Sequence, residues 1–248
     1  MENILVYDEL DAIREAGKVA AEVLRELKRI IKPGISTKDV EIFFEDTLKR
    51  YPDMEAAFKG YQDYPASLCV SVNEEIIHGI PSERKLITGG DLVSVDLGIK
   101  YKGLFVDTAF TYMVGEVSSL AERLVETCRI ALSEAIKKVQ VGGKIGDLSA
   151  AVQNSVETKG FSVIRNFVGH GIGRVLHTFP EIPNFGKENT GPELVEGMVL
   201  AIEPMIAIGN YEIDILDDGW TAKTKDNSLS AHFEHTVAVT KKGPWILS

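Results

Sequence analysis

Two apolar stretches of the 248-residue chain each end in a carboxylate six residues after a glycine, at Asp96 and at Glu203. A second acid follows in each stretch, Asp107 in the first and Glu234 in the second, and each opens another strand-like segment. Apolar strands rarely accept acids without a partner, and four carboxylates in one place repel one another unless cations hold them. The pattern therefore predicts a site in which four acids bind cations.

Two divalent cations would balance the four negative charges, and oxygen ligands with a nitrogen donor suit a paired site of Mn²⁺, Fe²⁺, Co²⁺ or Zn²⁺. Among the five histidines, His170 is the first candidate, because it lies in Gly169-His-Gly-Ile-Gly173 directly after an apolar pair. Its glycines would let backbone approach a metal closely. A dinucleotide-binding loop is the rival interpretation, but the third glycine is misplaced and no helical pattern begins there. His232 and His235 flank Glu234, and the pattern assigns neither a role.

Apolar spacing of three and four residues predicts helices at about 8–31, 39–50, 118–139 and 147–159. Gly34 and Asp39 recur as Gly142 and Asp147 at an offset of 108, close to the 107 residues that separate Asp96 from Glu203. We therefore expect one domain, 1–248, built from two similar halves at about 8–115 and 118–243, each contributing two helices and antiparallel strands to a shared sheet.

Each acid pair is expected to lie on a hairpin. Asp96 and Asp107 are centred on residues 101–102, so that regular antiparallel pairing would set them opposite one another. Glu203 and Glu234 are centred on residues 218–219, an Asp-Gly pair that favours a two-residue hairpin turn. The sequence thus predicts the second pair to lie opposite one another as well.

Composition excludes several classes of protein. The net charge of −10, from 27 basic and 37 acidic residues, argues against a surface that follows nucleic-acid phosphates. No signal peptide or membrane-spanning run is evident, so we expect a cytoplasmic protein without membrane partners. Cys69 and Cys128 are too few for a disulfide framework, which fits a reducing compartment.

Six motifs give the chain a close resemblance, over essentially its full length, to the type I methionine aminopeptidases of metallopeptidase family M24. This family has the pita-bread fold, an α+β architecture of two pseudo-symmetric halves around one curved sheet. In this sequence the motifs read Ser71-Val-Asn-Glu-Glu-Ile-Ile-His-Gly-Ile-Pro81, Val95-Asp-Leu-Gly98 with Asp107 beyond it, Gly169-His-Gly-Ile-Gly173, Ala201-Ile-Glu-Pro-Met205, Trp220-Thr-Ala-Lys-Thr-Lys-Asp226 and Ser230-Ala-His-Phe-Glu-His-Thr236.

The resemblance implies an enzyme that hydrolyses the bond after the initiator methionine of nascent polypeptides with a small second residue. Two metal ions would be bound by Asp96, Asp107, His170, Glu203 and Glu234, with Asp107 and Glu234 bridging and Glu203 moving protons as a catalytic residue. A hydroxide between the metals would attack the first peptide bond. The expected partner is the nascent N-terminus, with the ribosome as a further candidate, and we expect a monomer.

The resemblance also assigns the substrate contacts. His78 and His177 would be catalytic residues that touch the substrate, with His177 stabilising the tetrahedral intermediate. The methionine side chain would enter a pocket lined by Tyr61, Tyr64, Cys69 and Trp220, which suits a polarisable thioether.

The chain departs from the common family pattern at three places. Phe58 stands where many members have cysteine, Leu176 replaces an aromatic residue, and Thr178-Phe179 replaces an acidic pair. None removes a ligand or a substrate histidine.

Two alternatives share the expected fold. Prolidase and aminopeptidase P would keep the five ligands but usually carry a large amino-terminal domain, for which a first helix starting by about residue 8 leaves no room. A non-catalytic binding protein of the same fold would have lost acids, and all are present here.

Overall fold

Four long helices form where the apolar spacing predicted them. The structure is a computed structural model and describes residues 3–248. The helices are α1 (Tyr7–Ile30), α2 (Thr37–Leu48), α3 (Ser119–Lys137) and α4 (Ile145–Glu157), with a short 3₁₀ helix η1 (Tyr61–Asp63). Across residues 3–248, none of these helices is long and apolar enough to cross a membrane.

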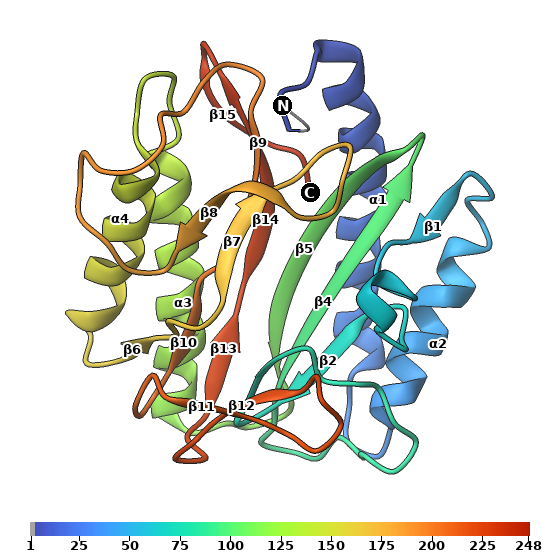
Figure 1. Ribbon diagram of the computed structural model, residues 1–248. Helices are drawn as coiled ribbons and strands as arrows, with labels where there is room; N and C mark the ends of the chain where they lie inside the picture. Colours follow the sequence, from blue (N-terminus) through green and yellow to red (C-terminus); the bar gives the residue numbers. More distant parts are fainter. Residues whose placement is uncertain (1–2) are drawn as a thin grey trace.

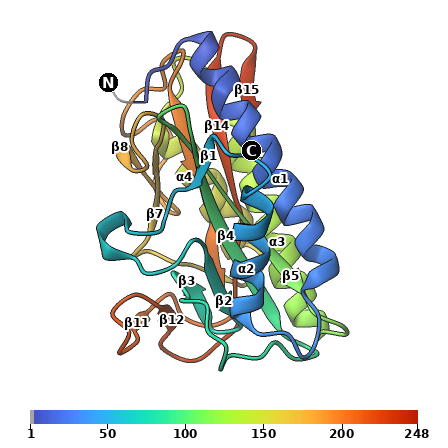
Figure 2. The same cartoon turned by 90° about the vertical axis from the view of Figure 1, so that its right-hand side faces the viewer.

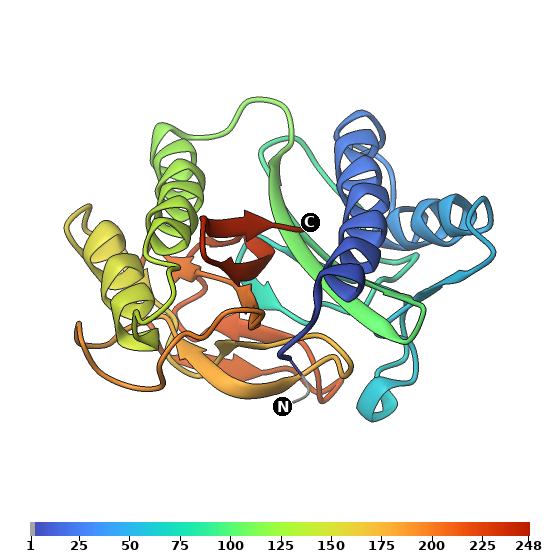
Figure 3. The same cartoon turned by 90° about the horizontal axis from the view of Figure 1, so that it is seen from above.

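A nine-stranded sheet runs through the molecule, and its path of hydrogen-bonded neighbours is β1-β4-β5-β14-β9-β7-β8. Strand β2 pairs with β4, and β15 pairs with β14. Seen from above, the four helices pack on one face of the curved sheet (Figure 3). The strands are β1 (Met54–Ala56), β2 (Cys69–Val72), β3 (Glu75–Ile77), β4 (Leu92–Tyr101), β5 (Leu104–Met113), β6 (Ser162–Val163), β7 (Val168–Gly171), β8 (Thr178–Pro183), β9 (Val199–Ile202), β10 (Met205–Ala207), β11 (Ile213–Ile215), β12 (Ala222–Thr224), β13 (Ser230–His232), β14 (Glu234–Thr240) and β15 (Gly243–Ile246).

Each helix pair packs on its own part of the sheet. Helix α1 packs on β4 and β5, with α2 beside α1 and β1, whereas α3 packs on β10, β13 and β14, with α4 beside β6 and β8 (Figure 1). Two separate clusters of buried apolar side chains follow this division, and they pack the helices against the sheet. The opposite face carries η1, β3, β11 and β12, which stand clear of the helices (Figure 2). It is this helix-free face that can hold a site.

The start of the second helix is built the same way in both halves. Asp39 accepts a hydrogen bond of 2.7 Å from the backbone N–H three residues earlier, and Asp147 accepts one of 2.9 Å in the same position. Gly34 and Gly142 open these segments with φ of 98° and 84°, values that favour glycine. The constant offset of 108 thus corresponds to the same cap and the same turn.

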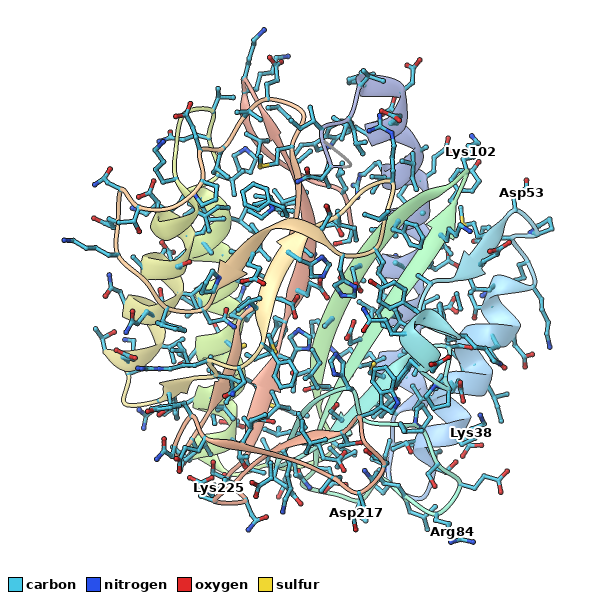
Figure 4. All side chains as sticks on the ribbon, in the orientation of Figure 1. Lys38, Asp53, Arg84, Lys102, Asp217 and Lys225 are labelled. Atoms are coloured by element: carbon cyan, nitrogen blue, oxygen red, sulfur yellow. The ribbon has the colours of Figure 1, made fainter. Side chains whose placement is uncertain are left out.

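The first hairpin differs from the prediction by two residues. Its two-residue turn is Lys102-Gly103, both with positive φ (51° and 77°), because a tight hairpin turn needs this conformation and glycine adopts it readily. Asp96 therefore lies opposite Ala109 rather than opposite Asp107. Since the displacement is two residues, both acids keep the same face of the sheet. Lys102 itself points outwards at the hairpin tip (Figure 4).

The register of the second acid pair agrees with the prediction. Ile202 pairs with His235 in β9 and β14, so the next positions along, Glu203 and Glu234, face one another. Pro204, which lacks an N–H, separates β9 from β10, but the same register resumes beyond it.

The predicted two-residue turn at Asp218-Gly219 is wrong. β11 and β12 pair from Ile215 and Ala222 outwards, which leaves a loop of residues 216–221. Asp218 uses its carboxylate to accept hydrogen bonds from the N–H groups of Trp220 and Thr221, and this widens the turn.

Candidate metal centre and substrate cavity

Four neighbouring strands bring the predicted acids together on the helix-free face. Asp96 lies within β4, Asp107 within β5, Glu234 at the start of β14 and Glu203 directly after β9. These strands are consecutive in the sheet, in the order β4-β5-β14-β9. None of these four acids is more than 7% exposed, so the four carboxylates lie together in a buried region.

His170 joins the acids from β7, the next strand beyond β9. Its Nε2 lies 3.5 Å from Oε1 of Glu203, and its Nδ1 lies 3.0 Å from the carbonyl oxygen of Gly171. With Nδ1–H donating to that carbonyl, the lone pair of Nε2 faces the acids, which is the usual arrangement of a metal-binding histidine. Burial lowers the pKa of His170 to about 3, so the ring is neutral.

The glycines around His170 are required by the close approach of neighbouring strands. A Cβ on Gly169 would lie 2.5 Å from the carbonyl oxygen of Ala201, and one on Gly171 would lie 2.3 Å from that of Phe179. Real Cβ atoms do not approach other atoms this closely. The neighbouring chain segments can therefore pack against His170 only because Gly169 and Gly171 have no side chain.

The cluster suits divalent cations. Asp96 Oδ1 and Glu234 Oε1 are buried without a hydrogen-bond partner in residues 3–248, and burial raises the pKa of Asp96 to about 7 and those of the other three acids well above their ordinary values. Cations would give these oxygens the partners they lack. Three sets of ligand atoms lie within 4.8 Å of one another, namely Asp96, Asp107 and Glu234; His170, Glu203 and Glu234; and Asp107, His170 and His177.

A cavity of about 290 Å³ opens in front of the acids. The structure places every sequence-predicted site residue on its wall, and both Phe58 and Leu176 lie there too. The predicted residues on the wall are Tyr61, Tyr64, Cys69, His78, Asp96, Asp107, His170, His177, Glu203, Trp220 and Glu234.

The end of the cavity near Trp220 is aromatic and rigid. The rings of Tyr64 and Trp220 meet edge to face at 5.1 Å, and the Tyr64 hydroxyl lies 3.2 Å from the carbonyl oxygens of Leu68 and Gly79. His78 packs its edge against Phe167 at 5.4 Å and has a φ of 62°, a strained conformation that recurs at functional sites. Burial lowers the pKa of His78 to about 4.

His177 lies on the loop between β7 and β8, at the opposite rim. Its ring lies 4.1 Å from that of His170 and 5.1 Å from that of Tyr61. Two contacts hold the loop. The backbone N–H of Phe105 donates to the carbonyl of Gly173 at 2.8 Å, and the guanidinium of Arg174 donates to both carboxylate oxygens of Glu9 at 2.9 and 2.7 Å.

We expect Arg174→Ala to lower kcat/KM by about 2- to 5-fold while changing the free energy of unfolding by less than about 1 kcal/mol, because exposed ion pairs contribute little stability. The loss should arise in catalysis, because the two hydrogen bonds from Arg174 to Glu9 orient the loop that carries His177. Lys49→Ala, which removes an exposed pair with Asp46 elsewhere, is the matched control and should leave kcat/KM unchanged. Equal kinetics for both variants would contradict the positioning role.

His232 lies at the site although its sequence pattern assigned it no role. This imidazole is 1% exposed, its Nε2 lies 3.5 Å from Oε2 of Glu203, and neither ring nitrogen has a hydrogen-bond partner in the described residues. Its position two residues before Glu234, on the same face of the chain, was the available signal. His235, as alternation predicts, faces away and lies 2.9 Å from the hydroxyl of Ser248. Five further cavity residues were not predicted from the sequence, namely Gln62 in η1, Ile77 in β3, Val168 in β7, and Asn166 and Phe167 before β7.

Comparison with known proteins agrees with this geometry. The family model of metallopeptidase family M24 matches residues 11–241. A methionine aminopeptidase of Clostridium acetobutylicum is 43% identical over 240 residues, 97% of this chain and 96% of its own. The crystal structure of a methionine aminopeptidase from Thermotoga maritima superposes with a TM-score of 0.97 at 46% identity, covering 100% of this chain and 99% of that one.

The chain therefore belongs to metallopeptidase family M24, whose members use divalent metal ions. Within that family its relatives place it among the methionine aminopeptidases, which confirms what the motifs predicted. A prolidase of Pyrococcus horikoshii shares the fold at a TM-score of 0.77 and 24% identity, and this chain covers 63% of its length.

Proposed function

We propose that this protein removes the first methionine from polypeptides whose second residue is small. One observation carries the proposal. Four buried acids and one neutral histidine converge on the floor of a cavity, and the end of that cavity near Trp220 is aromatic. The floor suits hydrolysis supported by metal ions, and aromatic walls suit a thioether side chain.

The metal centre is proposed to hold two divalent ions, ligated by Asp96, Asp107, His170, Glu203 and Glu234. Asp107, His170 and Glu234 each belong to two of the ligand sets. Of these three only the carboxylates have two ligand atoms that can face two ions, which supports a bridging role for Asp107 and Glu234. When bound, such a pair supplies a hydroxide nucleophile at neutral pH and polarises the scissile carbonyl.

The remaining steps fall to side chains of the cavity. Glu203 is the proposed proton shuttle, because its carboxylate lies between the imidazoles of His170 and His232, 3.5 Å from each. Burial lowers the pKa values of His78 and His177, so each neutral ring can donate one N–H to the substrate. His177 would stabilise charge on the carbonyl oxygen of the intermediate. Methionine would lie against Tyr61, Tyr64, Cys69 and Trp220.

We further propose that residues 1–248, of which 1 and 2 lie outside the described structure, form one catalytic domain of two related halves. The repeated caps at Asp39 and Asp147 support this. The protein is proposed to act in the cytoplasm as a monomer on nascent N-termini, with the ribosome as a partner. Two free cysteines, Cys69 and Cys128, fit that compartment.

A peptide assay separates this function from its alternatives. We expect release of methionine from Met-Ala-Ser, dependent on divalent metal, and at least about 100-fold less from Met-Lys-Ser, because a long second side chain meets the crowded metal-binding wall. Released methionine is quantified by chromatography after metal titration. Cleavage of Ala-Pro peptides instead would indicate an X-Pro hydrolase, and no cleavage of any peptide would indicate a non-catalytic binding protein.

A further inference from the structure

A second hollow, of about 720 Å³, adjoins the catalytic cavity. We call it the β8 groove. It shares Val168, His170 and His177 with the cavity, so the two spaces meet at the rim beside the metal ligands. Its walls are β8 on one side and, on the other, the start of α4 with residues 185–192. Figure 1 shows the two walls as ribbons, with β8 lying between α4 and β7.

The β8 groove is largely apolar. The side chain of Phe179 is 59% exposed, although an aromatic ring of this size is normally buried, and single exposed rings gain importance when they line a hollow. The other apolar residues on its wall are Ile145, Val168, Pro183, Phe185 and Pro192, and its polar residues besides the two histidines are Ser149, Thr178, Glu181 and Thr190. Phe179 belongs to the Thr178-Phe179 pair that stands where the resemblance places acids, so this chain's departure from its family falls on the groove.

Strand β8 ends the path of the nine-stranded sheet. It pairs with β7 on one side, and within residues 3–248 no strand pairs with its other side. An edge strand presents unpaired backbone groups to an extended peptide, and pockets beside it select alternate side chains. Pro180 and Pro183 of β8 have no N–H to donate, so the carbonyl groups and the remaining N–H groups of the strand are the ones that a peptide can use. The groove therefore combines the two features that recognise an extended apolar segment.

The positions of the cavity and the β8 groove indicate in which direction a substrate chain would run. The aromatic end near Tyr64 and Trp220 belongs to the cavity alone, the acids lie on its floor, and His177 lies at the rim shared with the groove. A chain whose first side chain fills the aromatic end and whose first peptide bond lies over the acids can continue past His177 into the groove. An extended substrate rises by about 3.3 Å per residue, as a strand does, so the six residues of β8 are long enough to accompany the third, fourth and fifth residues of a substrate.

We propose that the β8 groove binds the third to fifth residues of the substrate in extended conformation and favours apolar side chains there. This inference rests on the proposed aminopeptidase function. It makes the enzyme selective beyond the second residue, with Phe179 as the main determinant.

The test compares Met-Ala-Leu-Phe-Leu-Ser with Met-Ala-Ser-Ser-Ser-Ser. For the wild type we expect kcat/KM to be about 10-fold higher for the apolar hexapeptide, as burial of one or two side chains gives. Phe179→Ser and, independently, Phe185→Ser should bring the ratio of the two values towards 1. Because each ratio is measured within one variant, altered folding yield cancels. Leu86→Ser, at a 56% exposed site away from the groove, should keep the wild-type ratio.

Equal kcat/KM for both hexapeptides in the wild type would overturn the groove proposal, and so would an unchanged ratio in both phenylalanine variants. Met-Ala-Ser is too short to fill the groove, so its cleavage by the wild type reports on the aminopeptidase function alone. Cleavage of the tripeptide without an apolar preference in the hexapeptides rejects only the groove, whereas failure to cleave the tripeptide rejects the function.

Discussion

Glu203→Gln is expected to lower kcat by about 10³-fold, within the range found when a catalytic acid or base is removed. The amide keeps the shape of the side chain but can neither carry the proton nor give the same charge to a metal. Steady-state kinetics on Met-Ala-Ser at saturating metal measures the loss, and calorimetric titration with Mn²⁺ or Co²⁺ should show weaker binding as an independent result.

Glu41→Gln is the matched control. Glu41 is also a buried carboxylate, 1% exposed, and accepts a hydrogen bond of 2.7 Å from the backbone N–H of Ser67, but it lies outside the cavity. We expect this variant to lose stability and to keep kcat within about 3-fold of the wild type, because the hydrogen bond supports the fold and not the reaction. A Glu203→Gln enzyme within 10-fold of the wild type would contradict the proposed proton shuttle.

Removal of metal is expected to make the protein less stable, and increasingly so as pH rises from about 6.5 to 8.5. Burial and mutual repulsion raise the folded-state pKa values of Asp96, Asp107, Glu203 and Glu234. Between their unfolded values near 4 and these raised values, the metal-free folded chain binds more protons than the unfolded chain, so stability falls with pH. For Asp96 alone, a pKa of about 7 against 3.8 corresponds to about 4 kcal/mol, most of which is lost below pH 6.5, so the decline above pH 7 arises from the other three acids.

The buried histidines act in the opposite direction at lower pH. The pKa of His170 is lowered to about 3 and those of His78 and His235 to about 4, so they destabilise the folded state as pH falls below 6.5, where the unfolded chain takes up protons. Above pH 6.5 this contribution has ended, and the carboxylates dominate.

Urea unfolding at pH 6.5, 7.5 and 8.5, with chelator or with saturating metal, measures the effect of the carboxylates on stability. The free energy of unfolding of the metal-loaded protein should not fall over this pH range, because its ligands are already ionised and paired with cations. Metal-free Glu203→Gln should decline less steeply than the wild type, since it carries one fewer buried acid. A pH-independent stability for the metal-free wild type would contradict a cluster of four mutually repelling carboxylates.

Local periodicity was sufficient for much of the fold and the site. The helices agree with the predicted ranges to within two residues at nearly every end, because each buries an apolar face at a spacing that the sequence displays directly. The glycine-to-acid spacing singled out Asp96 and Glu203, and the strand-like segments that follow singled out Asp107 and Glu234. The shared register of Glu203 and Glu234 followed from symmetry about residues 218–219.

The two hairpin turns and the role of His232 could not be predicted from local periodicity. The first hairpin turns at Lys102-Gly103, because two positive φ angles must coincide there, and a count of residues between Asp96 and Asp107 does not show where that happens. At Asp218-Gly219 a strong turn signal was overridden by the hydrogen bonds of Asp218, which hold a longer loop. His232 was missed because its importance depends on its distance from Glu203, a residue 29 positions away.

Residue types and strand periodicity are local properties, so the sequence was enough to select two pairs of acids and His170 as candidate metal ligands. Only the tertiary structure decided that β4, β5, β14 and β9 lie side by side, that His177 reaches His170, and that a second hollow continues the cavity along β8. These facts depend on the packing of segments far apart in the chain, and a cavity exists only where several such segments leave space between them.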